Sequence, residues 1–363
     1  MEKRLLFLSS PHITKGFIMK KSSLVFLLLS FTVLVFAQQK NVIKTQAQKP
    51  TEPQPMSSGK FTGMIFNDFF YIVQEPQTGN VSVGISGRNA SVLRRAMLGY
   101  EYSYNKDISA KLVYDGTGNV LKQGYAEVKN IGPMMDLKLG LNQTLSSEIV
   151  EKIWDYRSLE ATVLDKKGMT NEFDMGLTLT GRVNPQGTTY ARLAVYNGSG
   201  LAIENDKLKK LALVIGNWFD KSSVIELYVD YENVGGGRST LTGKVFYGMT
   251  AMKFTFGGEG FYRMNRKFAG TSDITPVGAS LFGWYELMKS LRGVVRVDIT
   301  DDNLDVSTTG YREVYLNAGV DYSPIPEVRL IPNLAYVKNL KKSTGTEIAD
   351  DIMVRLTTAV YFK

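Results

Sequence analysis

Apolar and polar side chains alternate along most of this chain, in segments of roughly ten to fourteen residues that turns separate. Such alternation is typical of β-strands that have one apolar and one polar face. The pattern predicts about sixteen strands, at 60–73, 92–104, 108–115, 125–130, 134–142, 172–183, 189–197, 208–219, 224–233, 240–249, 253–266, 277–288, 294–300, 313–323, 329–338 and 352–362.

The connections between these segments alternate in length. One set is short, at 105–107, 131–133, 184–187, 220–222, 289–293 and 324–326. The other set is mostly longer and polar, for example at 75–90, 198–207, 267–276, 301–312 and 339–351. Outer-membrane barrels have short periplasmic turns, longer outer loops and an even number of strands, whereas a soluble sandwich has no reason to keep this parity. The sequence therefore predicts an all-β fold, a transmembrane antiparallel β-barrel that spans outer-membrane lipid.

Charged side chains gather on one face of the predicted strands. In 92–104, Leu98 lies on the apolar face and Arg95 on the charged face. A lipid-facing Arg costs about 2–4 kcal/mol at the bilayer midplane and less near the interface. We therefore expect the charged face to line the lumen, Arg94 to snorkel at the outer end of the lipid face, and Leu141 to face lipid. The expected pore-lining residues are Arg95, Lys111, Lys138, Arg182, Arg192, Arg296, Asp298 and Arg355.

Positive and negative charges are interleaved on this predicted inner face. Rings of one sign set the ion preference of a pore, so interleaved signs predict pairing across strands and weak selectivity at most. Arg296 and Asp298 are expected to pair with each other as a structural rung rather than to bind solute.

Residues 144–171, here called the long segment, break the alternation. The segment has about 28 residues and carries charges of both signs, and it is far longer than an ordinary hairpin connection. We predict that it is the third outer loop, that it folds into the lumen, and that it forms the constriction of a pore. Lys152 and Arg157 are the expected contacts for a passing anion. The full set of expected constriction residues is Glu148, Glu151, Lys152, Asp155, Arg157 and Lys166.

The amino terminus has the pattern of an export signal. From Met19 the chain has the basic pair Lys20 and Lys21, an apolar stretch at 24–36, and Ala37 at a position that a signal peptidase prefers. We predict cleavage after about Ala37. A transmembrane helix is the rival interpretation, but the apolar stretch is shorter than the ~20 residues that a bilayer needs.

Three further regions complete the predicted organisation. Residues 1–18 are expected to be an over-extended gene start or an unusually long n-region. Residues 38–59 are rich in Gln, Pro, Lys and Ser, which predicts a disordered periplasmic tether or, alternatively, a partner-binding segment. Residues 60–363 form the predicted barrel. Its penultimate Phe362 resembles the carboxy-terminal aromatic that barrel-assembly machinery recognises, although Lys363 follows it.

The composition of the exported chain narrows its chemistry. The first 37 residues hold five Lys or Arg and one Glu, so their removal lowers the formal net charge from +8 to +4. The chain has no Cys, and its one His, His12, lies in the removed part. Thiol and histidine catalysis are therefore absent, and we expect no enzyme activity, no cofactor and no metal site. The modest charge and the lack of a basic helix or stacking motif also argue against nucleic acid as a partner.

Four short motifs bear on the family of this chain. They are Leu93-Arg94-Arg95-Ala96-Met97-Leu98-Gly99, Trp154-Asp155-Tyr156-Arg157-Ser158-Leu159, Val294-Val295-Arg296-Val297-Asp298 and Asn317-Ala318-Gly319-Val320-Asp321-Tyr322-Ser323-Pro324. These motifs resemble the phosphate-selective porin O and P family. The resemblance spans most of the chain from about Ser91 onward. It implies a sixteen-stranded homotrimeric channel of the Gram-negative outer membrane, with the loop after the fifth strand as the constriction. The Arg ladder and Lys cluster that select phosphate in this family have no counterpart that we can place in the sequence.

These observations predict an outer-membrane porin, a passive diffusion channel for small hydrophilic solutes, with at most a weak preference for anions of the phosphate type. The competing classes are an outer-membrane barrel enzyme and a surface receptor or adhesin without channel function. The enzyme would have to work with carboxylates alone, and no pair of them stands out. A receptor or adhesin would be expected to have long outer loops, whereas most loops here are short.

Overall fold

The computed structural model describes residues 57–74, 89–204, 206–344 and 349–362. The predicted signal peptide, nearly all of the predicted tether and most of the connection at 75–90 lie outside the described residues.

The described chain forms one antiparallel sheet and two short helices. The strands are β1 Ser58–Gln74, β2 Asn89–Ser103, β3 Ile108–Asp115, β4 Val120–Gly132, β5 Met135–Gln143, β6 Phe173–Arg182, β7 Thr189–Tyr196, β8 Lys210–Trp218, β9 Ser223–Gly235, β10 Arg238–Thr250, β11 Phe254–Ala269, β12 Ser272–Ile274, β13 Val277–Met288, β14 Leu291–Asp301, β15 Tyr311–Ile325, β16 Val328–Lys341 and β17 Asp351–Phe362. The helices are α2 Glu148–Trp154 and α3 Val163–Lys166. Among the described residues, no helix is long and apolar enough to cross a membrane.

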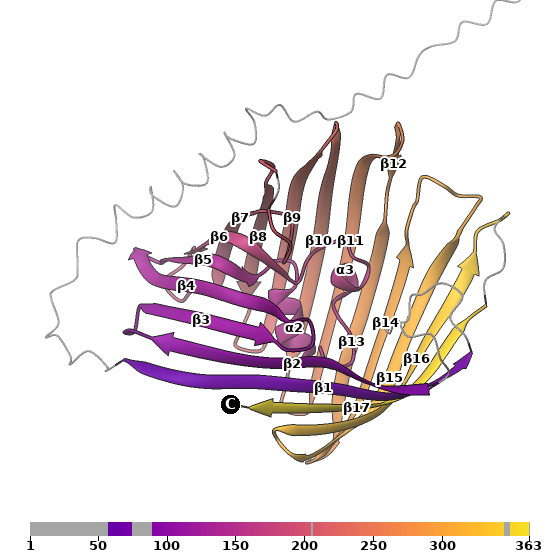
Figure 1. Ribbon diagram of the computed structural model, residues 1–363, viewed down its shortest axis with the longest axis horizontal. Coiled ribbons are helices and arrows are strands. Elements are labelled where there is room, and N and C mark those ends of the chain that lie inside the picture. The colour runs from indigo at the N-terminus through magenta and orange to yellow at the C-terminus, as the bar shows by residue number, and fades with distance from the viewer. Residues whose placement is uncertain (1–56, 75–88, 205, 345–348, 363) are drawn as a thin grey trace, which may run out of the picture. The chain divides into compact units, whose positions relative to one another are not determined.

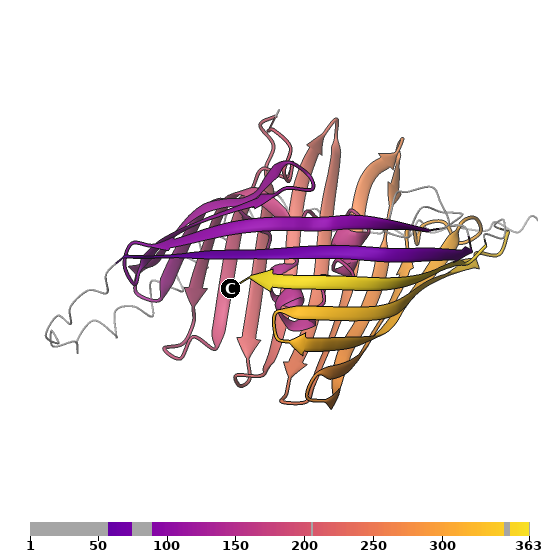
Figure 2. The same cartoon turned by 60° about the horizontal axis from the view of Figure 1, so that its bottom comes forward.

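The sheet closes on itself. Each long strand pairs with its neighbours in sequence, and β1 also pairs with β17, with Ile65 opposite Val360. Figure 2 shows β17 lying beside β1 at this seam. The three-residue β12 pairs only with the end of β11, and β11 pairs directly with β13. The other sixteen strands form the wall, so the predicted closed sixteen-stranded barrel is confirmed.

Side chains alternate between the outer and inner faces of the wall. In β2, for example, Leu98 is 60% exposed and Met97 only 7%. Arg94 was predicted to lie on the outer face but does not, and a β-bulge explains the difference. Phe66 pairs with Arg95 and Asn67 with Leu93, so Arg94 has no partner across the ladder. An extra residue in one strand lets two consecutive side chains face the same way.

Leu141 is a second departure from the predicted faces. It is 7% exposed and packs inside the barrel with Met97 and Val113 instead of facing outward. The preceding Gly140 has φ +120°, and a Cβ at this position would lie 2.3 Å from the carbonyl oxygen of Gly124. Glycine permits this conformation, and we attribute the reversed direction of Leu141 to it.

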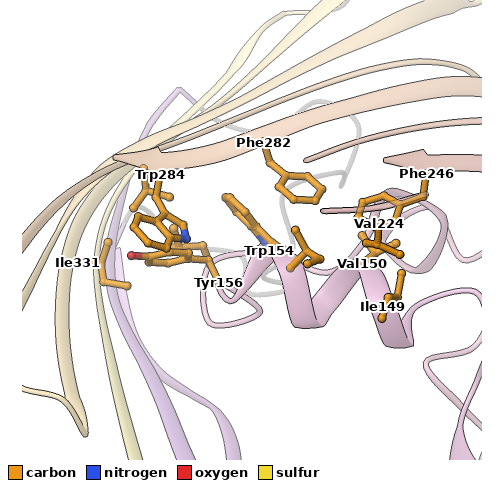
Figure 3. Close-up of a cluster of buried hydrophobic side chains, with 12 residues drawn as sticks. Ile149, Val150, Trp154, Tyr156, Val224, Phe246, Phe282, Trp284 and Ile331 are labelled. Atoms are coloured by element: carbon orange, nitrogen blue, oxygen red, sulfur yellow. The ribbon is translucent and has the colours of Figure 1, made fainter. Parts of the chain in front are cut away.

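The long segment connects β5 to β6 and lies inside the barrel, where Figure 1 shows α2 and α3 within the curve of the sheet. Trp154 of α2 is buried against Phe282 of β13, with ring centroids 4.9 Å apart. Figure 3 shows this contact at the centre of an apolar cluster. The segment supplies Ile149, Val150, Ile153, Trp154, Tyr156 and Leu159 to the cluster, and the wall supplies Val224, Phe246, Phe282, Trp284, Val294 and Ile331.

Cations of the inner wall hold the backbone of the long segment. A buried carbonyl that lacks a hydrogen-bond donor is costly. Arg or Lys side chains of the wall donate to six carbonyls of the segment, five of them in buried or partly buried contacts and that of Asp155 in an exposed one. The pairs are Lys244 with Ser146, Arg329 with Asp155, Arg94 with Ser158, Arg355 with Leu159, Arg296 with Ala161 and Arg263 with Met169. The segment is therefore fixed to the wall by polar contacts as well as by the apolar cluster.

Candidate functional site

In the part of the chain that the structure describes, two cavities lie between the long segment and the wall around β1–β5. The first, of about 520 Å³, is lined by Gly99 and Lys111 near the end of the barrel that has short turns. The second, of about 540 Å³, is lined by Thr117 and Gly118 of the β3–β4 connection at the opposite end. We call them the turn-side cavity and the loop-side cavity. Arg95 and Arg157 line both, so the two cavities adjoin there.

The two cavities differ in charge. The turn-side cavity is balanced, with the cations Arg95, Lys111, Lys152 and Arg157 and the carboxylates Glu148, Glu151, Asp155 and Glu172. The loop-side cavity has an excess of positive charge, with the cations Arg94, Arg95, Lys122, Arg157, Lys166 and Lys167 and the carboxylates Asp115, Glu160 and Glu313. A solute that passes through the lumen beside the segment would meet both environments.

Two β-bulges bring cations to the loop-side cavity. The first places Arg94 beside Arg95, as described above. The second lies in β4, where Val113 pairs with Gln123 and Tyr114 with Leu121, so Lys122 has no partner across the ladder. Lys122 lines the loop-side cavity and Gln123 the turn-side cavity. Sequence reasoning missed Lys122 because the bulge breaks the alternation, and for the same reason it began this strand at about residue 125 rather than at Val120.

Arg157 lies at the centre of a cluster of carboxylates. Its Nε donates to Glu151 Oε1 at 3.1 Å, and its Nη2 donates to Asp165 Oδ2 at 2.9 Å and to Glu172 Oε2 at 3.0 Å. Arg95 Nη1 donates to Glu172 Oε1 at 3.0 Å, which joins the cluster to β2. Oxygen atoms of the three carboxylates lie within 4.8 Å of one another, a spacing that would suit a metal ion. The Arg157 guanidinium already binds all three, so we assign no metal site.

Two carboxylates of this cluster, Glu151 and Glu172, have pKa values that depart from the ordinary value in opposite directions. Burial, and next the Glu172 carboxylate, raise the pKa of Glu151 to about 8. Burial also opposes ionisation of Glu172, but Arg157 and Arg95 outweigh it and lower the Glu172 pKa to about 2. Glu172 has the stronger contacts, because both of its oxygens accept from guanidinium groups, whereas Glu151 shares Arg157 and accepts one bond from Gln143 at 2.8 Å.

The other expected constriction residues occupy different places. Lys152 and Asp155 line the turn-side cavity, and Asp155 accepts a bond from Arg329 at 2.6 Å. Glu148 lines the same cavity and accepts from Arg192 at 2.6 Å.

Lys166 lines the loop-side cavity although its side chain is only 5% exposed. Its Nζ has no hydrogen-bond partner, lies 3.1 Å from the centroid of the Tyr315 ring, and is 3.7 Å from the carboxylates of Asp298 and Glu313. Burial lowers the pKa of Lys166, which these carboxylates only partly oppose.

Of the predicted pore-lining residues, Arg95 and Lys111 line the cavities. Lys138 lies over the Tyr125 ring, and Arg182 pairs with Asp136 at 3.0 Å beside the turn that follows β6.

The remaining predicted pore-lining residues are buried against other protein groups. Arg192 joins Glu148 to Glu226. Arg296 pairs with Asp298 at 2.8 Å, which confirms the predicted rung. Arg296 and Arg355 lie behind the long segment and line neither cavity.

Two further stretches of the chain, one rich in glycine and one acidic, have structural roles. The glycines at 235–237 form the tip of the β9–β10 hairpin. The acidic stretch after β14 wraps around Lys342, whose ammonium group donates to Asp301 Oδ1 at 2.7 Å, to the Asn303 carbonyl at 2.6 Å and to the Val306 carbonyl at 2.7 Å. Lys342 thus satisfies oxygen atoms of this stretch within the protein.

Comparison with known proteins places this barrel among the porin folds. It is similar to the outer-membrane channel DcaP of Acinetobacter baumannii, with a TM-score of 0.63 and 13% identity over 87% of this chain and 100% of that chain. It is also similar to the trimer form of OmpT of Vibrio cholerae, with a TM-score of 0.61 and 11% identity over 85% of this chain and 100% of that chain. A third likeness is to an anion-selective porin from Comamonas acidovorans, with a TM-score of 0.59 and 11% identity over 84% and 100%.

No family model and no curated protein sequence matches the chain. At 11–13% identity, the structural likenesses establish the fold alone. The chain has the general fold of the sixteen-stranded porins.

Proposed function

We propose that this protein is a porin of the Gram-negative outer membrane, a passive and non-enzymatic channel for small hydrophilic solutes that prefers anions weakly. The observation that supports this proposal is the pair of adjoining cavities inside a closed barrel, between the long segment and the β1–β5 wall. The fixed segment narrows the lumen, and the excess of cations on the loop side attracts anions and repels cations.

Finer features belong to the same proposal. The anions would include those of the phosphate type, in keeping with the resemblance to the phosphate-selective porin O and P family. Arg95, Lys111, Lys122 and Lys152 would contact solute, while Arg157 would act mainly by holding the carboxylates beside the path. Export by a signal peptide cleaved after about Ala37, recognition of Phe362 by barrel-assembly machinery and assembly as a homotrimer complete the proposal.

Conductance of the refolded protein in planar lipid bilayers tests this function. We expect stepwise conductance increments and a reversal potential in a potassium chloride gradient that indicates more permeation by chloride than by potassium. Folded protein that inserts but gives no increments would contradict the channel. Phosphate that blocks chloride current at low concentration would show stronger anion selectivity than we propose. Native gels in mild detergent test the trimer separately, and a monomer there would remove it without affecting the channel.

A further inference from the structure

The carboxylate cluster around Arg157 has more negative than positive groups. Glu151, Asp165 and Glu172 contribute three carboxylates, whereas Arg157 and Arg95 contribute two guanidinium groups that contact them. Like charges this close oppose each other's ionisation, so the cluster is best balanced when it holds one extra proton.

Glu151 is the member best placed to hold that proton. Glu172 accepts from two guanidinium groups, and Asp165 lies 2.9 Å from Arg157 Nη2. Among the described residues, the second oxygen of Glu151 accepts a hydrogen bond from the neutral amide of Gln143 and from no cation. Other charged groups surround the cluster. Glu148, Lys152 and Asp155 line the same cavity as Glu151. Lys122 on β4 acts on Glu172, and Glu160 acts on Asp165.

Glu151 also borders the path that we propose for solutes. It lines the turn-side cavity, and its partner Arg157 lines both cavities. A charge that appears on Glu151 therefore changes the field at the junction of the cavities, where the channel discriminates between ions. Groups of this kind titrate as a unit, so the cluster as a whole gains and loses one proton.

We propose that Glu151 holds a proton near neutral pH and releases it in mildly alkaline solution, which makes the ion selectivity of the channel depend on pH. The raised pKa of about 8 described above is in keeping with this assignment. Below that pH the neutral Glu151 leaves the anion preference intact. Above it the new negative charge repels anions. This inference rests on the proposed channel function, but the proton site is defined without it.

The first test is the reversal potential in a salt gradient between about pH 6 and about pH 9.5. We expect the ratio of anion to cation permeability to fall about threefold to tenfold as the pH rises, because one unit charge ~6 Å from an ion in water disfavours an anion and favours a cation by about threefold each before salt screens it. In Glu151→Gln, the ratio of anion to cation permeability measured near pH 6 should stay the same up to about pH 9.5. Glu148→Gln is the matched control, because it removes a carboxylate that lines the same cavity but lies outside the cluster. In this variant the permeability ratio should still fall as the pH rises. A permeability ratio that still falls with rising pH in Glu151→Gln would overturn the proposal.

The second test reads the proton directly. Infrared difference spectra of folded protein between about pH 6 and about pH 9.5 should show loss of a carboxylic-acid C=O band. The lost band should be weaker by one carboxylic acid in Glu151→Gln and unchanged in Glu148→Gln. This readout needs no conductance, so a protein that shows the band but gives no channels would contradict the proposed function and leave the proton site standing. Absence of the band in the unmodified protein would overturn the proton site.

Discussion

At the scale of single residues, two cations reach the lumen because each occupies a β-bulge. Arg94 is opposite no residue of β1, and Lys122 is opposite no residue of β3. Both line the loop-side cavity, but they differ in their contacts. Arg94 binds Asp68 and the Ser158 carbonyl, whereas the one carboxylate within ion-pair distance of Lys122 among the described residues is Asp115, at 3.9 Å. In the proposed channel, Lys122 would therefore be the cation of this pair that acts on a solute.

Lys122→Gln should weaken the anion preference without loss of stability. Removal of one positive charge from the loop-side cavity is expected to lower the ratio of anion to cation permeability about threefold to tenfold, because the charge acts on anions and cations in opposite directions. The measurement is the reversal potential in bilayers. Lys221→Gln, an exposed cation in a short turn that lines neither cavity, is the control and should leave the ratio unchanged. An unchanged ratio in Lys122→Gln would place the solute path away from β4.

The pKa of Glu151 also has a consequence for stability. Because the pKa in the folded protein, about 8, lies above the ordinary value of 4.5, the folded state binds the proton more tightly than the unfolded state. Stability should therefore decline as the pH rises from about 4.5 to about 8. Glu151→Gln cannot ionise, so its melting temperature should equal that of the unmodified protein near pH 5 and exceed it near pH 9.

Glu172 is the opposite case, which makes it a useful contrast. Its pKa in the folded protein, about 2, is depressed, so its stabilising contribution is present above about pH 4.5 and is lost as the pH falls toward 2. Glu172→Gln should therefore lower the melting temperature at neutral pH and narrow the difference in acid. Thermal melts of both variants across this range give the comparison. A Glu151→Gln variant that is less stable than the unmodified protein at pH 9 would contradict the assigned sign.

At the scale of elements, the long segment determines which cations of the inner wall are taken up by contacts within the protein. Its buried backbone needs donors, and the wall meets that need with Arg and Lys from β2, β10, β11, β14, β16 and β17. Of these six cations only Arg94 lines one of the two cavities, and the other five are taken up by contacts with the segment. In the proposed channel, the solute path would therefore run beside the wall around β1–β5.

Trp154→Ala should loosen the long segment while the barrel stays folded. Loss of a fully buried aromatic side chain costs about 3–5 kcal/mol, and here the cost falls on the docking of the segment against Phe282 and Ile331. We expect amide hydrogen exchange across 144–171 to become at least about 100-fold faster. Phe219→Ala, which truncates a side chain that is 62% exposed, is the control. Equal protection of the segment in both variants would mean that the apolar cluster does not hold it.

At the scale of the whole molecule, closure of the sheet replaces the covalent restraints that this chain lacks. There is no cysteine in the sequence, and backbone pairing of β1 with β17 removes the two free edges that an open sheet would have. The stability of the barrel therefore depends on an unbroken ladder at this seam.

Val354→Pro tests closure. Val354 is 48% exposed on the outer face and pairs with Tyr71 of β1 and Leu334 of β16, so the substitution removes a ladder donor but no interior packing. We expect the variant to lose the compact, heat-modifiable form on gels in sodium dodecyl sulfate. Val354→Ala should keep it. A compact form in Val354→Pro would mean that closure tolerates a break at the seam.

The sequence by itself determined the class of fold, the number of strands, most inward and outward faces, and the place of the long segment. These properties follow from local periodicity and from the lengths of connections, which are readable in one dimension. Arg95, Lys111, Lys152 and Arg157 were likewise found from the pattern alone, because alternation or the long segment identifies them.

Only the tertiary structure decided which charges are used for packing and which line the two cavities. The inward position of Arg94, Lys122 and Leu141 depends on local breaks in the alternation. The burial of Arg296 and Arg355 depends on carbonyl groups more than 130 residues away along the chain, as the sequence separations of 135 and 196 show. Pairings of that kind arise from the docking of one element on another, and no periodicity records them.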